Sequence, residues 1–540
     1  MMTPNPKIVE LSKDQLEALL QRVEAGLPED DYKTIKALVE AYVCLTELVE
    51  AKGTTIERLR KLLFGSPTEK TRDVVPQKEE DESEGVDPEP EPATKHKGHG
   101  RNGAEAYRGA EKIEVPHESL RTGDACPDCT KGKVYAMAQP GVLIRITGQA
   151  PVQAKVYKLQ RLRCHLCGKV FTAQTPKGVG AAKYDATSAS MIALLKYGSG
   201  LPFNRLQGLQ GSLGLPLPAS TQWDIVNTAA RRIEPVYQEL IRQAAQGEIL
   251  HNDDTPMKIL ALMGERAKSE ASAEDAPQRK GVFTSGIVSI NEGRRIALFF
   301  TGRKHAGENL ATVLARRAAD LGPPIQMCDA LSRNLPAEFQ TLVANCLAHG
   351  RRQFVDVTPH FPEACRHVLE RLGEVYRNDA VARERKLSPE ARLRFHQAES
   401  GPVMEALHGG LARQFEDRLV EPNSGLGQAI AYLLRHWEKL TLFLRKAGAP
   451  LDNNVCERAL KKAILHRKNA LFYKTEHGAH VGDLFMSLIH TCELSRIDPF
   501  DYLTELQRNA EALSSTAPMW MPWNYRETSE PTAALAPPVR

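Results

Sequence analysis

The sequence feature that most constrains the fold is an ordered series of apolar segments between Gly247 and Asp329. Three strand-like segments come first, a helical segment at 308–321 follows, and a fourth apolar strand ends at Asp329. The first strand also ends in acids, at Asp253 and Asp254. This is the order of an RNase H-like core, in which the first and fourth strands are neighbours and their acids meet at one edge. The predicted strands are 247–255, 281–290, 294–301 and 325–329.

A third acid is predicted on a helix further along the chain. Glu457 follows Asp452 and Asn453, either of which can cap a helix, so Glu457 would lie in the first turn. Charged residues are frequent at strand ends, and a single acid there has an ordinary structural explanation. Three acids in this order favour a shared site.

Carboxylates suit Mg²⁺, a hard ion that prefers oxygen ligands and keeps positions open for phosphate and water. Two such ions, about 3.5 to 4 Å apart, can activate an attacking hydroxyl and stabilise the departing oxygen. We therefore predict Asp253, Asp329 and Glu457 as catalytic ligands of two magnesium ions, with Mn²⁺ as a possible substitute.

Four of the ten cysteines form two C-x-x-C pairs, Cys126 with Cys129 and Cys164 with Cys167. Ten cysteines in 540 residues are too sparse for a disulfide scaffold. Two short turns that each present two thiolates can instead enclose one tetrahedral zinc ion. A redox role for one pair is the alternative, but it leaves the other pair unexplained. The pattern predicts a structural Zn²⁺ held by all four cysteines.

Apolar residues repeat every seven positions near the N-terminus, which is the pattern of a coiled coil. The first set is Ile35, Tyr42, Val49, Ile56 and Leu63, and the second is Leu38, Leu45 and Leu59. The repeat predicts a homo-oligomer, in the first place a dimer, formed through Ile35 to Leu63. An amphipathic helix packed on its own chain is the alternative.

Two further segments are predicted before the core. Residues 76–93 are rich in Glu, Asp and Pro and cannot bury enough apolar surface to become ordered, and a basic run follows at 95–101. Downstream, 202–213 has helical spacing, a Gly- and Pro-rich break follows, and a new helix opens at Ala219. The pattern is typical of a helix-turn-helix with Gln222 near a DNA groove, and an ordinary helical hairpin fits it equally.

The net charge of +4 over 540 residues is small, so attraction to nucleic acid must come from local basic patches. Arg458, Lys461 and Lys462 form such a patch within one turn of the helix that carries Glu457. The start of the sequence does not resemble a signal peptide, and no stretch approaches the roughly 18 apolar residues of a membrane span. We expect a cytoplasmic protein without membrane association.

Three motifs carry a resemblance to a known family. The most specific begins as DNNVCER at Asp452 and ends as RKNALF at Phe472. The second, CLAHGRRQF, spans 346–354, and the third is DDT at 253–255. The chain resembles the large transposases of the insertion sequence sixty-six family over nearly its whole length. That family usually has Glu where this chain has Asp254, so the resemblance places its first catalytic aspartate at Asp253.

The resemblance implies an aspartate-aspartate-glutamate triad of Asp253, Asp329 and Glu457, preceded by zipper and zinc-binding segments. It also implies a mostly helical insertion between the second and third acids. For His349, structure and DNA contact both stay open. The predicted DNA-binding residues are His349, Arg351, Arg352, Arg458, Lys461, Lys462, Arg467, Lys468 and Asn469.

The predicted fold class is multidomain α/β: an RNase H-like catalytic core with a helical insertion, preceded by coiled coil, zinc ribbon and helix-turn-helix. From Ser514 onward we expect a disordered tail, with Trp520 and Trp523 as candidate partner contacts. The boundaries are 1–75 for the coiled coil, 76–104 for the linker, 105–180 for the zinc ribbon, 181–245 for the helix-turn-helix, 246–360 for the first part of the core, 361–449 for the insertion, 450–495 for the second part with Glu457, and 496–540 for the C-terminal extension and tail.

The expected activity is strand cleavage and strand transfer of an insertion sequence. Water first releases a 3′-hydroxyl at an element end, and that hydroxyl then attacks target DNA by in-line displacement. Expected partners are element-end and target DNA, further copies of the chain and accessory proteins of the same element, in the nucleoid of a bacterial cytoplasm. One alternative is a structure-selective nuclease that cleaves without joining. The other is a non-catalytic zinc-containing DNA-binding regulator, against which the retention of three acids argues.

Overall fold

The computed structural model describes residues 182–263 and 281–528 continuously, together with shorter stretches before them. Those stretches are Tyr32, Glu105, 115–129, 131–137, Leu143, 149–163, His165, Cys167 and 170–180. The predicted coiled coil, the linker 76–104 and Cys164 lie outside the described residues. The chain divides into two compact units, residues 1–77 with 355–370 and residues 78–354 with 371–540, and the large sheet belongs to the second.

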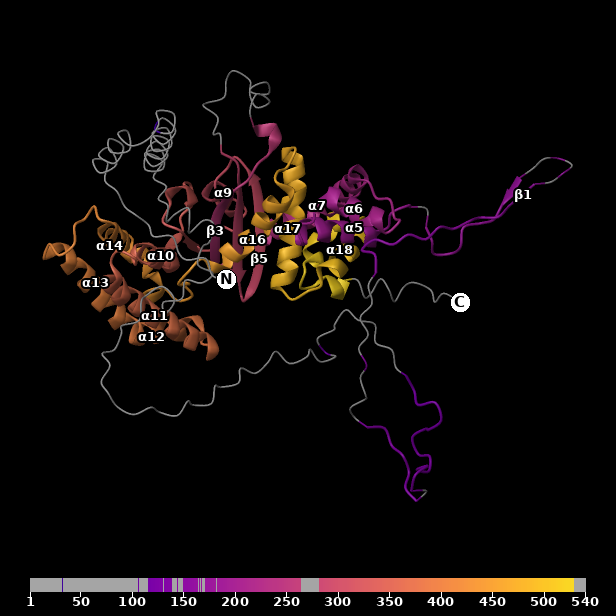
Figure 1. The fold of residues 1–540 in the computed structure, drawn as a ribbon, viewed down its shortest axis with the longest axis horizontal. Helices are drawn as coiled ribbons and strands as arrows, with labels where there is room; N and C mark the ends of the chain where they lie inside the picture. The colour runs from indigo at the N-terminus through magenta and orange to yellow at the C-terminus, as the bar shows by residue number, and fades with distance from the viewer. Residues whose placement is uncertain are drawn as a thin grey trace. The chain divides into compact units, whose positions relative to one another are not determined.

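Five strands form one mixed sheet, and four of them correspond to the strands predicted from the sequence (Figure 1). The strand order is β5-β4-β3-β6-β7. The pairs β3–β4 and β4–β5 are antiparallel, whereas β3–β6 and β6–β7 are parallel. The predicted α/β class is confirmed, and the first and fourth predicted strands are direct neighbours. The strands are β3 (Ile249–Pro256), β4 (Phe283–Asn291), β5 (Arg294–Gly302), β6 (Ile325–Cys328) and β7 (Leu342–Asn345).

Helices cover both faces of the sheet, and two residues of β4 show which helix covers which face. The Ser289 hydroxyl donates to the Ala244 carbonyl of α7 at 2.7 Å. A Cβ on Gly286 would instead meet Leu460 and Cys456 of α16. Because successive strand residues point to opposite faces, α7 and α16 lie on opposite faces. The helices that contact the sheet include α7 (Ala219–Ala244), α9 (Ala306–Leu314), α16 (Asn454–Ala470) and α17 (Glu476–Leu494).

Helix α17 closes the β5 edge of the sheet with three buried polar side chains spaced four residues apart. Four helical residues advance about 6 Å, which nearly matches the roughly 6.8 Å between alternate residues of a strand. Each side chain can therefore accept one of the edge N–H groups that a neighbouring strand would otherwise bond. These hydrogen bonds run from Thr301 N to Asp483 Oδ2 at 2.6 Å, from Phe299 N to Ser487 Oγ at 3.0 Å and from Ala297 N to Thr491 Oγ1 at 3.1 Å.

Asp483 makes the stability of this edge pH-dependent. Burial raises the pKa of Asp483 to about 7, although two bonds from Thr301 lower it. Between pH 4 and 7 the unfolded carboxyl ionises while the folded one stays protonated, so stability present below the unfolded pKa is lost as pH rises. Relative to the near-isosteric Asp483→Asn variant, the native chain is expected to lose up to about 4 kcal/mol of unfolding free energy across this window.

Urea unfolding at several pH values measures this difference directly. The two proteins share every other titrating group, so the contributions of these groups to the pH dependence of the unfolding free energy cancel in the comparison. The exposed Asp320 is the control, because Asp320→Asn removes the same charge from a solvated position. If the Asp483→Asn curve runs parallel to the native curve over the whole range, the Asp483 carboxyl is already ionised in the folded chain.

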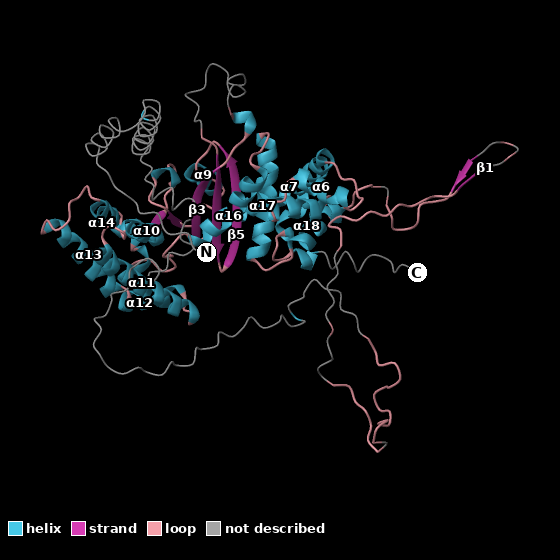
Figure 2. Cartoon of the chain, in the orientation of Figure 1, coloured by secondary structure: helices cyan, strands magenta, loops and turns pink. Residues whose placement is uncertain are grey.

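The segment between β7 and α16 is entirely helical in its regular structure (Figure 2). Buried Asp379 of α11 ties this helix to α12, because it accepts from Arg392 at 2.6 Å and His396 Nε2 at 3.2 Å, and it also pairs with Arg383 of its own helix at 2.7 Å. Burial raises the pKa of Asp379, but the bond from His396 and the charge of Arg392 outweigh it and lower the pKa to about 2. The helices are α10 (Leu347–Val357), α11 (Pro362–Glu384), α12 (Pro389–Glu399), α13 (Gly401–Glu416), α14 (Gly425–Arg435) and α15 (Trp437–Leu440), with a 3₁₀ turn η5 (Leu442–Leu444).

The helices before the sheet do not present Gln222 to a groove. Gln222 is fully buried, and its amide donates to the carbonyls of Phe203 at 3.0 Å and Leu217 at 2.9 Å. The predicted DNA-facing position of Gln222 is therefore wrong, because this side chain fastens the turn between α6 and α7. The N-cap of α7 is Pro218, so Ser220 and Thr221 lie inside the helix. The elements here are α5 (Ala186–Ala193), η2 (Leu194–Gly198) and α6 (Phe203–Ser212).

The predicted disordered tail is also wrong for residues 514–528. Trp520 is 2% exposed, and its carbonyl accepts from the Tyr502 hydroxyl at 2.8 Å. Tyr525 is 1% exposed and donates to Asp501 at 2.6 Å. This segment therefore belongs to the core. Its elements are α18 (Pro499–Arg508), α19 (Leu513–Thr516) and η6 (Ala517–Trp520); within the described ranges, none of the helices has the length and apolar character of a bilayer span.

Candidate active site

Two of the predicted acids lie on neighbouring strands at the same level. In the parallel pair β3–β6, His251 is in register with Met327. Asp253 and Asp329 each lie two residues beyond that pair, so the strand register brings them side by side. Asp329 follows the end of β6, and its Oδ1 accepts from Leu331 N at 3.1 Å and from the Asn334 amide.

Strand alternation separates Asp253 from its neighbour Asp254. Asp253 is paired with Gly286, whose missing side chain leaves the space that α16 occupies. Asp254 is paired with Ser285 on the opposite face, accepts from the Ser285 hydroxyl at 2.8 Å and lies 2.9 Å from His305 Nδ1. Asp254 is thus held by structural partners, and Asp253 is the acid on the face of α16.

Glu457 reaches this face because α16 packs unusually close to the sheet. A Cβ on Gly286 would lie only 2.9 Å from Leu460 Cδ2, so a glycine is needed at this contact. The Cys456 thiol donates to the Gly286 carbonyl at 3.2 Å and fixes the height of the helix above β4. Glu457, the next residue, lies in the first turn of α16.

Asn453 connects the start of α16 to the strand that carries Asp253. It is fully buried; its amide donates to the Asn252 carbonyl at 3.1 Å, and its Oδ1 lies 3.1 Å from His251 Nδ1. The sequence suggested only a capping role, whereas the Asn453 side chain makes no cap hydrogen bond. Asn453 therefore positions Glu457 relative to Asp253. No local signal distinguishes this role from capping, because both partners lie some 200 residues away in sequence.

The three acids form a group of negative charges with few positively charged partners nearby. Burial, together with the charges of Asp329 and Glu457, raises the pKa of Asp253 to about 7. Within the described part of the chain, no salt bridge involves Asp253 or Asp329, and the ion-pair partner of Glu457 is His349, at 3.9 Å. Glu457 Oε1 is also buried without a hydrogen-bond partner. Carboxylate oxygens and an unfilled acceptor are the chemistry that Mg²⁺ prefers, so the types of these residues fit this ion.

The motif CLAHGRRQF at 346–354 also lies beside Glu457. Cys346 follows β7, and His349 lies in the first turn of α10. The side chain of His349 therefore lies beside an acid of the cluster. Arg351 and Arg352, predicted to contact DNA, lie on the same helix and are partly buried.

The basic residues of α16 divide into two groups. Arg458, Lys461 and Lys468 are exposed along one side of the helix. Lys462 instead pairs with Glu493 at 2.7 Å, and Arg467 donates to the Thr255 hydroxyl at 3.2 Å. The first group is thus available to a ligand, whereas the second already has intramolecular partners. Asn469 is partly buried next to them.

The three described cysteines of the two pairs lie in two separate turns. In the first, Cys129 N–H donates to Cys126 Sγ at 3.5 Å, and backbone N–H groups of Gly132 and Lys131 lower the pKa of Cys129. This arrangement favours thiolate, the form that binds zinc. Cys167 lies exposed in the turn between the antiparallel strands β1 (Arg161–Arg163) and β2 (Val170–Thr172). The four-cysteine zinc site stays a prediction, since Cys164 lies outside the described residues.

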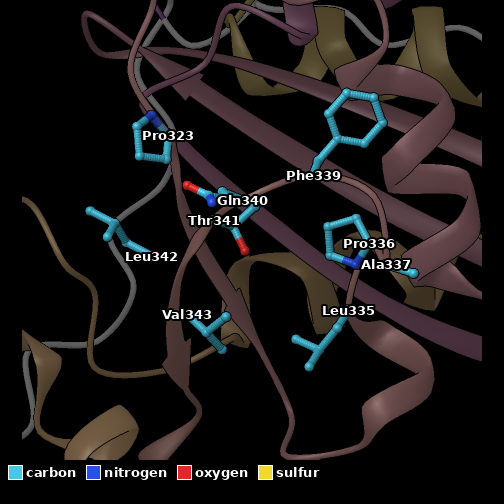
Figure 3. A pocket seen from close by; sticks show the side chains of 9 residues that line it. All are labelled: Pro323, Leu335, Pro336, Ala337, Phe339, Gln340, Thr341, Leu342 and Val343. Atoms are coloured by element: carbon cyan, nitrogen blue, oxygen red, sulfur yellow. The ribbon is translucent and has the colours of Figure 1, made fainter.

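A separate hollow of about 440 Å³ lies beside β7 (Figure 3). The loop 335–341 and the start of β7 surround it, together with Pro323. Its lining is mostly apolar and includes no titratable side chain, so it offers no catalytic group.

Comparison with known proteins places the chain in a family. The family model for the transposase IS66 family matches residues 182–481, more than half of the chain. The chain belongs to the IS66 family of transposases. The match contains the three acids and the helical insertion, and it leaves out the four paired cysteines.

Relatives of this IS66-family chain include two uncharacterized proteins of Sinorhizobium fredii (strain NBRC 101917 / NGR234). Protein y4jD is 28% identical over 356 residues, which is 63% of this chain and 65% of the relative. Protein y4hP is 26% identical over 404 residues, which is 70% of this chain and 69% of the relative. The chain thus spans a little under two thirds of y4jD.

Proposed function

We propose that this IS66-family protein is a DNA transposase whose catalytic residues are Asp253, Asp329 and Glu457. The observation that carries the proposal is the convergence of these acids from β3, the end of β6 and α16. Burial and, after it, repulsion by the other two acids raise the pKa of Asp253, as expected for carboxylates arranged to hold a cation. Family membership supports the same substrate class, DNA.

Asp253, Asp329 and Glu457 would hold magnesium ions, which when bound would supply Lewis-acid activation of the attacking hydroxyl and stabilisation of the departing oxygen. The chain's own contribution is the fixed position of the three oxygen donors. Asn453 and Gly286 set that position, because they hold the first turn of α16 against β3 and β4.

The proposed reaction has two steps with balanced bonds. In the first, water attacks a phosphodiester at the element end, the bond from phosphorus to the 3′-oxygen breaks, and a 3′-hydroxyl is released. In the second, this hydroxyl attacks a phosphodiester of target DNA, and one ester bond forms as another breaks. Neither step needs a covalent bond to the protein.

The exposed basic side of α16, formed by Arg458, Lys461 and Lys468, is the proposed contact for the DNA backbone. Each phosphate contact releases condensed counterions, so loss of one cation should lower the slope of log affinity against log salt by about 0.9. Lys462 and Arg467 are weaker candidates, since their partners Glu493 and Thr255 would have to be released.

Oligomerisation through Ile35 to Leu63, a zinc ribbon of the four cysteines and accessory proteins of the same element belong to the same proposal. Two copies would allow both ends of an element to be held together. The zinc ribbon would give the N-terminal part of the chain a compact fold without a large apolar core. Neither segment supplies a catalytic group.

Strand transfer on labelled element-end DNA tests the proposed function. With Mg²⁺ present, the protein should produce both nicked ends and products joined to target DNA, and both should be absent when Mg²⁺ is omitted. Cleavage without joining would favour a structure-selective nuclease on the same fold. DNA binding without either reaction, after accessory proteins are supplied, would favour a non-catalytic regulator.

A further inference from the structure

Two helix N-termini meet beside the three acids. Cys346 immediately precedes α10, and Glu457 lies in the first turn of α16. The backbone fixes the two starts to each other, because Leu347 N–H donates to the Leu451 carbonyl at 3.0 Å. Asn453 N–H also donates to Cys346 Sγ, at 3.2 Å. The thiol and the carboxylate are therefore rigidly placed at the starts of the two helices.

His349 completes a cluster with metal-ligand chemistry at this junction. One ligand atom from each of Cys346, His349 and Glu457 lies within 4.8 Å of the other two. His349 Nε2 is 3.9 Å from Glu457 Oε1, too long for a hydrogen bond. Two ligands of one zinc ion, each at about 2.0 to 2.2 Å from the metal, lie only slightly closer together.

The cluster also contains polar atoms that nothing in the fold satisfies. Glu457 Oε1 and His349 Nδ1 are both buried and have no hydrogen-bond partner, and Cys346 is 0% exposed. A buried acceptor without a partner carries the cost of its lost hydration. A cation that accepts a lone pair from Glu457 would remove part of this cost.

We propose that Cys346, His349 and Glu457 bind a thiophilic divalent cation of the zinc type, and that this cation withdraws Glu457 from the catalytic acids. The inference rests on the proposed function, in which Glu457 completes the triad. The Cys346 thiol releases one proton to water as its bond to the metal forms. A sulfur ligand selects zinc-type ions over magnesium, which prefers oxygen.

The consequence is competition between two kinds of metal for one carboxylate. Magnesium needs Glu457 together with Asp253 and Asp329, whereas the zinc-type ion needs it together with Cys346 and His349. Zinc should therefore inhibit magnesium-dependent cleavage. Cys346→Ser keeps a side chain that can accept from Asn453 N–H but removes the sulfur, so it should retain cleavage while half-inhibition requires at least about tenfold more zinc, since zinc prefers thiolate to hydroxyl.

Cobalt binding tests the site without reference to catalysis. The unaltered protein, Cys346→Ser and His349→Gln are titrated with Co²⁺, whose bonds to thiolate absorb in the near ultraviolet. The four paired cysteines contribute equally in all three proteins. The unaltered chain should bind one cobalt more than either variant, and the additional thiolate absorption should be absent from both. His349 is partly exposed, so His349→Gln keeps the test valid if Cys346→Ser fails to fold.

The outcomes separate the two proposals. Equal cobalt binding by all three proteins overturns the new site, whatever happens to DNA. A cobalt difference with equal zinc inhibition of the unaltered protein and Cys346→Ser overturns the withdrawal of Glu457. A cobalt difference without magnesium-dependent cleavage in any of the proteins overturns the proposed function and leaves the metal site in place.

Discussion

Replacing Glu457 with glutamine is expected to lower the rate of magnesium-dependent cleavage and joining at least about 1000-fold, with DNA affinity nearly unchanged. The substitution keeps the size and hydrogen-bonding shape of the side chain but removes the negative charge. Glu457 is partly exposed and forms no close ion pair, so the fold should not depend on it. Cleavage and strand transfer on labelled end DNA measure the loss, and a filter-binding or anisotropy assay measures the affinity.

Glu476→Gln is the matched control. Glu476 also lies exposed in the first turn of a helix, α17, at a position outside the acid cluster. It should leave both reactions at the native rate. A Glu457→Gln protein that cleaves as fast as this control would remove Glu457 from the active site and would leave Asp253 and Asp329 in need of a different third ligand.

The Gly286→Val substitution is expected to move Glu457 away from the two aspartates while all three acids stay unchanged. A Cβ there would lie 2.9 Å from Leu460 Cδ2 and 3.4 Å from Cys456 Sγ, so α16 must move away from the sheet. Overpacking of this kind costs about 1 to 3 kcal/mol of unfolding free energy. A displacement of about 1 Å at a catalytic centre can lower the rate roughly 100-fold, so cleavage should fall by that order while the protein stays folded.

Two further variants show whether crowding is the cause. Gly302→Val, also in a strand, has nothing within 4 Å of the added Cβ and should retain both stability and cleavage. Gly286→Val combined with Leu460→Ala makes space for the new side chain and should recover part of the lost rate. Equal loss of activity in the single and the double variant would show that the spacing of α16 does not set the position of Glu457.

The sequence predicts the sheet well where its signals are local. Four strands are recognised because apolar runs are bounded by turns such as that of Glu292 and Gly293, both of which have positive φ. The strand β7 is missed, since Leu342–Asn345 is too short to show a period. The direct pairing of β3 with β6 follows from the order of elements, and it places Asp253 next to Asp329.

The errors arise where a long-range contact decides the environment of a residue. Gln222 has the local sequence of an exposed helix start, yet it is buried and its amide donates to the carbonyls of nearby Leu217 and of Phe203, which lies 19 residues away. Trp520 lies in a stretch of low apolar periodicity, and contacts with the core, including the hydrogen bond from Tyr502 of α18, order it. The close packing at Gly286 can in principle be predicted from the sequence, because an isolated glycine inside an apolar strand often marks the close approach of another backbone. Nothing local, however, indicates that α16 is what approaches.

The polar ladder between α17 and β5 also restricts how copies of this protein can associate. Its three acceptors already bond the outward N–H groups of β5, so another chain cannot extend the sheet there. If several copies gather on one DNA molecule, as proposed, their local concentration would be high and an open strand would favour irreversible edge-to-edge polymerisation. Contacts on this side must use helix surfaces and side chains, which can form and dissociate without opening the fold.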